Sequence, residues 1–243
     1  VHQDKNDPLS PFKERFHFPK THTNESYIYF CGNSLGLQPD LAEQYVKEEL
    51  EAWKKLGVDG HLNAKRPWMP YHQFLTSHSA EIVGALDKEV VVMNSLTVNL
   101  HLLMASFYRP KGKRKKILIE KQAFPSDRYV VQSQLKFHSN EPYDDLIILE
   151  PDDGEFISTS TIMNTLNNHG EEIALVLLGG LNYYTGQAFD MATITDKAQN
   201  CGCRVGFDLA HAAGNLKINL HEWGVDFAAW CGYKFLNGGP GAP

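Results

Sequence analysis

The sequence has no long apolar run and no apolar segment near its first residue. Runs such as residues 173–178 are far shorter than the roughly 20 apolar residues that a membrane-spanning helix needs. The polar, charged stretch that begins at Val1 lacks the apolar core of a secretory signal. These absences predict a soluble protein of the cytoplasm with no membrane partner.

An excess of basic residues is also missing. The chain has 23 Lys and Arg against 29 Asp and Glu, a formal net charge of −6. That balance argues against nucleic acid or an anionic membrane as a general partner. The one basic run, residues 111–116, has no interleaved aromatic residues and is interpreted as a solvated turn.

Cysteine is sparse, and the common metal and nucleotide motifs are absent. The four cysteines form no CxxC pair and no zinc-type spacing, so they are interpreted as reduced thiols, and no metal site is predicted. There is no Walker A sequence, and no GxGxxG follows the first strand. A nucleotide-binding α/β module is therefore disfavoured.

What is present fits a single large α/β unit of 243 residues, 42% hydrophobic and 21% charged. Residues 1–26 read as an irregular arm, followed by a strand at 26–30 and an amphipathic helix from Asp40 to Gly57. From about residue 75, strands alternate with helices. Expected strands are 89–93, 117–120, 145–149, 173–178, 204–207 and 227–230; expected helices are 97–107, 128–138, 158–168 and 193–200. Strands that are apolar on both faces and separated by helices predict a mostly parallel sheet flanked by helices.

Two strand ends carry the most informative residues. Asp208 ends an apolar strand, with His211 three residues later, at the sheet edge where α/β proteins bind ligands. A buried carboxylate there needs a cationic partner, such as a protonated pyridine nitrogen, although a helix-capping Asp is the alternative. Lys234 ends the next apolar strand. In a partly desolvated pocket its amine can form a Schiff base with an aldehyde, although a lone strand-end lysine is often only a surface residue.

Two further segments are suited to a phosphate and a flat ring. Residues 93–97 join a strand to a helix, and the backbone N–H groups and hydroxyls at such a helix N-terminus bind anions. Serine and threonine also commonly cap helices, so this signal is weak alone. In residues 123–127, Phe124 can stack on a ring and Asp127 can accept a hydrogen bond from a ring substituent. The alternative is a proline-containing turn with a buried phenylalanine.

Together these segments resemble the kynureninase family, which belongs to the class V aminotransferase-like, fold-type I enzymes that depend on pyridoxal 5'-phosphate (PLP). The resemblance runs from about residue 10 to the end. The matching segments are Phe30-Cys-Gly-Asn-Ser-Leu-Gly-Leu-Gln-Pro39, Gly60-His61, Lys65-Arg-Pro-Trp68, Asn94-Ser-Leu-Thr-Val-Asn-Leu-His101, Ala123-Phe-Pro-Ser-Asp127, Tyr184-Thr-Gly186, Gly206-Phe-Asp-Leu-Ala-His211, Trp223-Gly-Val-Asp226 and Trp230-Cys-Gly-Tyr-Lys234.

The resemblance implies a role for each matched residue. Lys234 would carry PLP as a Schiff base and move protons, while Asp208 would keep the ring nitrogen protonated, with His211 in support. Tyr233 would reach a phosphate oxygen and act in proton transfer. Leu96 and Thr97 would contact the phosphate, Phe124 would stack on the ring and Asp127 would contact it; Ser34 and His61 would lie near the aromatic end of the substrate.

The implied reaction is hydrolysis of the Cβ–Cγ bond of L-kynurenine or 3-hydroxykynurenine, giving anthranilate or 3-hydroxyanthranilate and L-alanine. It belongs to tryptophan catabolism, in the kynurenine pathway toward NAD biosynthesis, and a homodimer is implied. Another fold-type I enzyme, such as a cysteine desulfurase or an aminotransferase, would share Asp208, His211 and Lys234. An inactive truncated fragment is the third possibility.

Two departures from the family pattern bear on the site. At Gly179 the family often has a small hydroxyl residue, so one contact there is in doubt. The chain starts at Val1 and stops in a Gly/Pro-rich stretch, which predicts a fragment. Residues 1–60 are expected to be an arm and helix contributing to a small domain, and residues 61–243 a large PLP-binding domain truncated after the lysine loop. The family's remaining residues supply the C-terminal small domain and an arginine for the substrate carboxylate.

Overall fold

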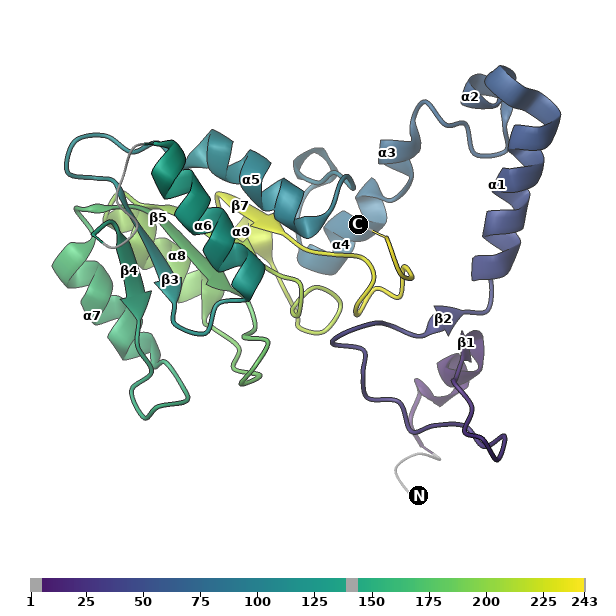
Figure 1. Cartoon of the computed structure of the whole chain (residues 1–243), viewed down its shortest axis with the longest axis horizontal. Coiled ribbons are helices and arrows are strands. Elements are labelled where there is room, and N and C mark those ends of the chain that lie inside the picture. The colour runs from purple at the N-terminus through teal and green to yellow at the C-terminus, as the bar shows by residue number, and fades with distance from the viewer. Residues whose placement is uncertain (1–5, 139–143, 243) are drawn as a thin grey trace.

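A five-stranded parallel sheet organises the chain from residue 116 onward (Figure 1). The computed structural model describes residues 6–138 and 144–242. All neighbouring strands of the sheet run parallel, which confirms the predicted α/β class. In spatial order the strands are β4 (Leu146–Leu149), β3 (Lys116–Glu120), β5 (Ile173–Gly179), β6 (Arg204–Asp208) and β7 (Phe227–Ala229).

Helices cover both faces of this sheet because each central strand is apolar on both sides. In β3, Ile117 and Ile119 join the cluster formed with α5 (Leu96–Phe107) and α6 (Pro125–Phe137). Leu118 points to the other face, where α7 (Thr159–His169) and α8 (Met191–Asn200) pack. This is the two-residue alternation of a strand. Each fully buried Leu or Ile side chain stabilises the fold by about 1.5–3 kcal/mol.

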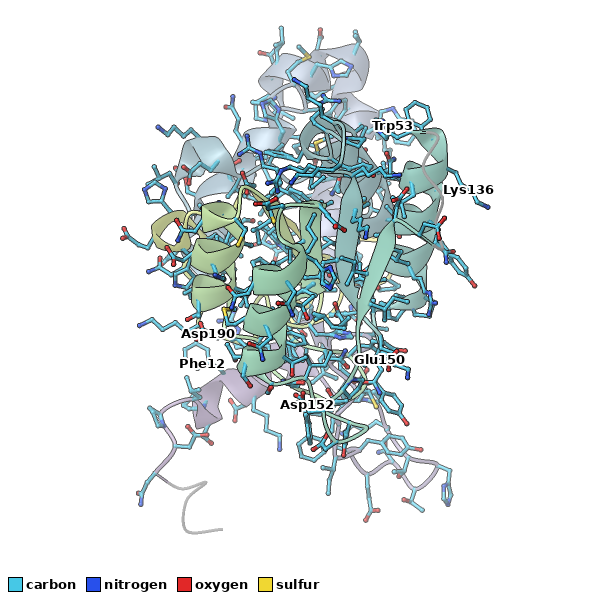
Figure 2. The ribbon with its side chains drawn as sticks, turned by 90° about the vertical axis from the view of Figure 1, so that its left-hand side faces the viewer. Phe12, Trp53, Lys136, Glu150, Asp152 and Asp190 are labelled. Carbon is cyan, nitrogen blue, oxygen red and sulfur yellow. The ribbon has the colours of Figure 1, made fainter. Side chains whose placement is uncertain are left out.

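The strand order places a switch point beside β3. The chain runs from β3 outward to β4 and then returns past β3 to form β5. In such sheets, ligands bind at the carboxyl ends of the strands next to the switch. Glu120, Gly179 and Asp208 end three neighbouring strands there, with Gly179 and Asp208 directly paired. Figure 2 shows Glu150 and Asp152, which follow β4, at this same edge.

The N-terminal arm has little regular structure. Its elements are a 3-10 turn (Ser10–Arg15), the antiparallel pair β1 (Phe16–His17) and β2 (Gln38–Pro39), and α1 (Ala42–Leu56). As predicted, α1 ends at Gly57, whose φ of 53° suits glycine. A short turn (Gly57–Asp59), α2 (Gly60–Asn63), α3 (Tyr71–Phe74) and α4 (Thr76–Val83) lead to the sheet, and α9 (Leu220–Trp223) precedes β7.

Two predicted strands are wrong. Residues 27–30 form no strand, and Ile28 and Phe30 are 85% and 88% exposed. Residues 89–93 also form no strand, because a 3-10 turn (Asp87–Glu89) precedes an irregular stretch. Both segments have β-type sequences, but among the described residues neither has a pairing partner beyond the isolated bridge of Ser26 with Lys20, and a strand needs a ladder to satisfy its backbone.

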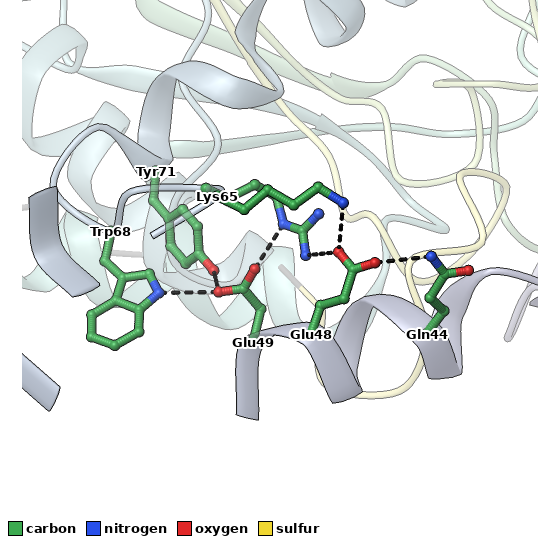
Figure 3. A network of polar contacts seen from close by, with 7 residues as sticks. Gln44, Glu48, Glu49, Lys65, Trp68 and Tyr71 are labelled. Carbon is green, nitrogen blue, oxygen red and sulfur yellow. Dashed lines mark hydrogen bonds and ion pairs between the residues drawn. The ribbon is translucent and has the colours of Figure 1, made fainter. Parts of the chain in front are cut away.

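Charged groups, rather than apolar packing, fasten residues 65–71 to α1 (Figure 3). Arg66 donates from Nε to Glu49 (2.7 Å) and from Nη2 to Glu48 (2.8 Å). Trp68 and Tyr71 donate to the other oxygen of Glu49, at 3.0 and 2.7 Å. Hydrogen bonds from Gln44, Arg66 and Lys65 lower the pKa of Glu48 to about 2. No residue between 6 and 59 is buried, so this network takes the place of a core.

Across residues 6–138 and 144–242, none of the helices has the length and apolar character that crossing a bilayer requires.

Candidate functional site

A cavity of about 280 Å³ opens at the carboxyl ends of β3, β5 and β6. The sequence-predicted residues Leu96, Thr97, Phe124, Asp127, Asp208, His211, Tyr233 and Lys234 all line it. They come from the start of α5, the start of α6, the end of β6 and the loop after β7. The fold thus gathers into one place side chains that are up to about 140 residues apart in the sequence.

Lys234 is the cation that faces this cavity. Its side chain is buried, 7% exposed, and Nζ lies 2.8 Å from Nε2 of His211. Burial, followed by the charge of Lys234, lowers the pKa of His211 and favours the neutral imidazole. A neutral imidazole can accept a proton from the lysine at that distance. The pair is therefore arranged to pass a proton between an amine and a base.

Two buried carboxyl groups lie together opposite the lysine. Asp208 Oδ1 accepts a hydrogen bond from the backbone N–H of Ala210 at 2.7 Å, so it also caps the turn that follows β6. Burial, followed by the charge of Asp208 and a hydrogen bond with it, raises the pKa of Asp127 to about 9. Asp127 is thus a proton-bearing neighbour of Asp208 rather than a second full charge.

The first turn of α5 supplies an anion-binding end to the cavity. Ser95 occupies the N-cap position, but its side chain makes no capping hydrogen bond. Ser95, Leu96 and Thr97 all line the cavity. The uncapped N–H groups and the positive end of the helix dipole attract a phosphate at this position. Tyr233 lines the same cavity, with its pKa raised by burial and by the neighbouring Cys231.

Aromatic rings form one wall of the cavity. Phe124 is 41% exposed at the start of α6, so the alternative of a buried turn phenylalanine is wrong. Its ring centroid lies 5.6 Å from Lys234 Nζ and 5.0 Å from the ring of Tyr183, edge to face. A half-exposed ring facing the lysine is suited to contact a flat ligand.

The loop of residues 31–36 borders the site from the N-terminal arm. Ser34 lines an adjoining cavity together with Tyr233 and Ser95. The N–H of Gly36 donates to the carbonyl of Tyr233 at 2.8 Å. A Cβ atom on Gly36 would come within 2.3 Å of the carbonyl oxygen of Lys234, so only glycine allows this approach.

His61 lies away from both cavities. It belongs to α2, and its ring packs edge to face on Trp68, with the centroids 5.4 Å apart. Trp68 in turn is fixed to α1 by Glu49 (Figure 3). The structure therefore places Ser34, but not His61, in the cavity that adjoins the lysine site within the described part of the chain.

Four lining residues were not singled out by sequence reasoning: Glu120, Leu181, Asn182 and Tyr183. Glu120, like Asp208, is an acid at the end of an apolar strand. The same sequence pattern therefore predicts it as a site residue. Gly179, the departure noted in the sequence, donates its N–H to Glu120 Oε1 at 3.0 Å. A Cβ atom on residue 179 would lie 3.0 Å from that oxygen, so Glu120 leaves little room for a side chain at this position.

The chain is similar over nearly its whole length to curated kynureninases. It is 55% identical to that of Koribacter versatilis over 242 residues, covering 99% of this chain and 57% of the relative. For Myxococcus xanthus the identity is 53%, covering 98% and 56%; for Homo sapiens it is 45%, covering 99% and 54%. The chain thus spans about half the length of the curated relatives it matches.

Solved structures agree on the fold. A cystine C–S lyase, solved with its product cysteine persulfide, has a TM-score of 0.72 at 20% identity, covering 88% of this chain and 55% of that one. A cysteine desulfurase from Escherichia coli has a TM-score of 0.71 at 16% identity, covering 94% and 55%. The profile of the family described as "Aminotransferase class-V" matches residues 45–242. The chain therefore belongs to the class V aminotransferase family.

Proposed function

We propose that this protein is a PLP-dependent hydrolase that cleaves the Cβ–Cγ bond of L-kynurenine, 3-hydroxykynurenine or both. The products are anthranilate or 3-hydroxyanthranilate and L-alanine, within tryptophan catabolism. The observation that carries the proposal is the buried Lys234, which faces Asp208, Asp127 and His211 in one cavity. The similarity to proteins named kynureninase directs it to this substrate class rather than to another PLP reaction.

The residues of the cavity fit PLP. Asp208 and Asp127 offer negative charge or hydrogen bonds to a ring nitrogen, and one buried carboxyl oxygen, Glu120 Oε2, has no protein partner in the described part of the chain. The uncapped start of α5 suits the phosphate, and Lys234 suits the aldehyde. When bound, PLP supplies a ring that withdraws electrons from the bonds at the substrate Cα.

Each residue then has a task of its own. Lys234 would hold the cofactor covalently and, as a free amine, would move protons through Nζ with His211 beside it. Asp208 would keep the ring nitrogen protonated, and Phe124 would fix the plane of the ring. Tyr233 would contact the phosphate and transfer a proton. Ser34 would contact the aromatic end of the substrate.

His61 would reach a substrate only through a rearrangement of the arm or from a second copy of the chain. We therefore include a homodimer in the proposal, because His61 lies outside its own cavity. A cytoplasmic location and the division into an arm-plus-helix part at 1–60 and a PLP-binding part at 61–243 are also proposals. The burial pattern supports the boundary, since Gly60 is the first buried residue among those described.

An absorption spectrum followed by addition of kynurenine tests the proposal. The wild-type protein with PLP should show a visible band and release fluorescent anthranilate. Lys234→Ala should lose the covalent band and reduce turnover by at least about 10³-fold, in the range of a lost proton-transfer group. Lys121→Ala is the matched control, because Lys121 lies at the same sheet edge but pairs with Glu150 on the surface. A visible band without anthranilate would exclude the kynurenine reaction while keeping a PLP enzyme.

A further inference from the structure

Glu120 is an acid placed where the sequence otherwise puts apolar side chains. It ends β3 directly after Ile117, Leu118 and Ile119, and it is 3% exposed. A buried carboxyl group without a cationic partner is costly, so such a residue needs a reason to be there. The cavity shared with Asp127 and Asp208 suggests that the reason is chemical.

The two oxygens of Glu120 have different surroundings. Oε1 accepts a hydrogen bond from the N–H of Gly179 at 3.0 Å. Oε2 is buried and has no partner in the described part of the chain. Gly179 is paired with Asp208 across β5 and β6, and the N–H of Gly180 donates to the carbonyl of Asp208. Glu120 therefore fixes the strand end that holds Asp208, through one oxygen only.

The charges that face Glu120 come from four other segments. Around the cavity the ionisable groups are Asp127 from α6, Asp208 from β6, and His211, Tyr233 and Lys234 from the loops after β6 and β7. Lys234 is the single lysine or arginine among the described lining residues, and His211 is held toward its neutral form. Three carboxyl groups and one such cation cannot all ionise together in a buried space. Burial, followed by the charge of Asp208, raises the pKa of Glu120 to about 7.

We propose that Glu120 is a positioning residue for the cofactor site: it binds the end of β5 through Oε1 and holds a proton on Oε2. It thereby leaves Asp208 as the full negative charge that faces a cationic ring. The inference rests on the proposed function for the identity of the ring. It adds a residue whose task is to control the charge beneath the ring without touching the reacting atoms.

Glu120→Gln separates this role from simple support of β5. Glutamine keeps an oxygen that can accept from Gly179 and resembles the protonated acid, but it cannot ionise. Glu150→Gln is the matched control, because Glu150 follows the neighbouring strand β4, lies at the same sheet edge (Figure 2) and is exposed. Glu120→Ala removes both the acceptor and the proton.

The PLP-loaded protein is measured in two ways. In infrared spectra, the wild type should show a protonated-carboxyl band at pH 6 that disappears as pH rises through about 7. The band should shift on carbon-13 labelling of glutamate, vanish in Glu120→Gln and persist in Glu150→Gln. In an absorption titration, the cofactor band of the wild type should change through the same pH range. Glu120→Gln should keep the cofactor and lose that step.

An infrared band that is unaffected by glutamate labelling in the wild type would overturn the proposal, whether or not the variants fold. A Glu120→Gln titration that superposes on the wild type would do the same, and would leave Glu120 as a structural acceptor for Gly179. Failure of the kynurenine reaction is seen separately, as absence of anthranilate from the wild type, and leaves the infrared result standing.

Discussion

The sheet-containing body and the N-terminal arm use the same kinds of residues in opposite ways. In the body, Leu118, Val176 and Phe207 are at most 1% exposed within a packed core. In the arm, Leu50 and Trp53 on α1 are 55% and 67% exposed, although α1 is amphipathic. An amphipathic pattern therefore identifies a helix without showing what covers its apolar face.

Acidic residues show the same contrast. In the arm, Glu48 is surrounded by donors in solvent, which lower its pKa to about 2. In the body, Glu120 and Asp127 are buried, which raises their pKa values to about 7 and about 9. The solvated network of the arm stabilises the ionised form of Glu48, whereas the buried cavity stabilises the protonated forms of Glu120 and Asp127. The comparison shows that burial decides two things: how much a leucine side chain contributes to stability, and whether an acidic side chain is ionised.

The largest effect should come from truncating a leucine in the body. Leu166→Ala in α7 removes a side chain that is 1% exposed and should reduce the free energy of unfolding by about 2–5 kcal/mol. Leu50→Ala in α1 is the same change on an exposed helix face and should cost less than about 0.5 kcal/mol. Urea unfolding measures both. Equal losses would mean that α1 is covered in the folded protein and would break the comparison.

The pH dependence of stability should be the next largest effect. Unfolded carboxyl groups ionise near pH 4, whereas folded Glu120 and Asp127 keep their protons up to about pH 7 and about pH 9. Between pH 4 and these folded-state values the unfolded state therefore binds fewer protons, and stability falls as pH rises, by about 1 kcal/mol per pH unit for each of the two groups. Urea unfolding of the PLP-free protein from pH 5 to pH 8 checks this. Asp127→Asn should flatten the curve; a stability that rises over this range contradicts it.

A substitution at the junction of arm and body should have a smaller effect. Gly36→Ala places a Cβ atom 2.3 Å from the carbonyl oxygen of Lys234 and should destabilise by about 1–3 kcal/mol. It should also weaken PLP binding by displacing the lysine loop. Gly32→Ala is the control in the same loop, since its Cβ would meet only Phe235 at 3.8 Å. A PLP titration measures the affinity of both variants. Identical affinities would show that the contact at Gly36 does not influence PLP binding.

The smallest global effect is expected where residues 65–71 contact α1. Arg66→Ala removes the two hydrogen bonds of Arg66 to Glu48 and Glu49 but leaves those of Lys65, Trp68 and Tyr71 (Figure 3). Because these partly buried ion pairs lie outside the packed core, unfolding of the body should not change, while proteolysis near residue 66 should become a few-fold faster. Lys65→Ala, with one bond to Glu48, should change cleavage less. A body destabilised by Arg66→Ala would show that the two regions are coupled.

Much of the fold could be predicted because the body is locally consistent. Apolar runs such as residues 173–178 are strands that find partners on both sides, and Gly57 ends α1 as its position predicted. Residues 26–30 have an equally good strand sequence, but within the described part of the chain they form only the isolated bridge of Ser26 with Lys20. Pairing depends on distant residues, and propensity within five residues contains no information about it.

The candidate site could be predicted in part for a similar reason. Asp208 and Lys234 both end or follow apolar strands, and parallel strands bring their carboxyl ends to one edge. Glu120 met the same criterion and was overlooked. The place of His61 could not be predicted, because the contacts of Trp68 with Glu49 decide it. The catalytic roles of all these residues stay predictions.

The contact between Gly36 and the loop that carries Lys234 has a consequence for folding during synthesis. Gly36 leaves the ribosome about 200 residues before Tyr233, whose carbonyl accepts its N–H. At roughly 5–20 residues per second, the loop waits about 10–40 s for the surface that receives it. During that time Ile28 and Phe30, which stay exposed even in the finished fold, are available to chaperones. The arm is therefore the first part of the described chain to be made, and its contact at Gly36 can form only after Tyr233 has been made.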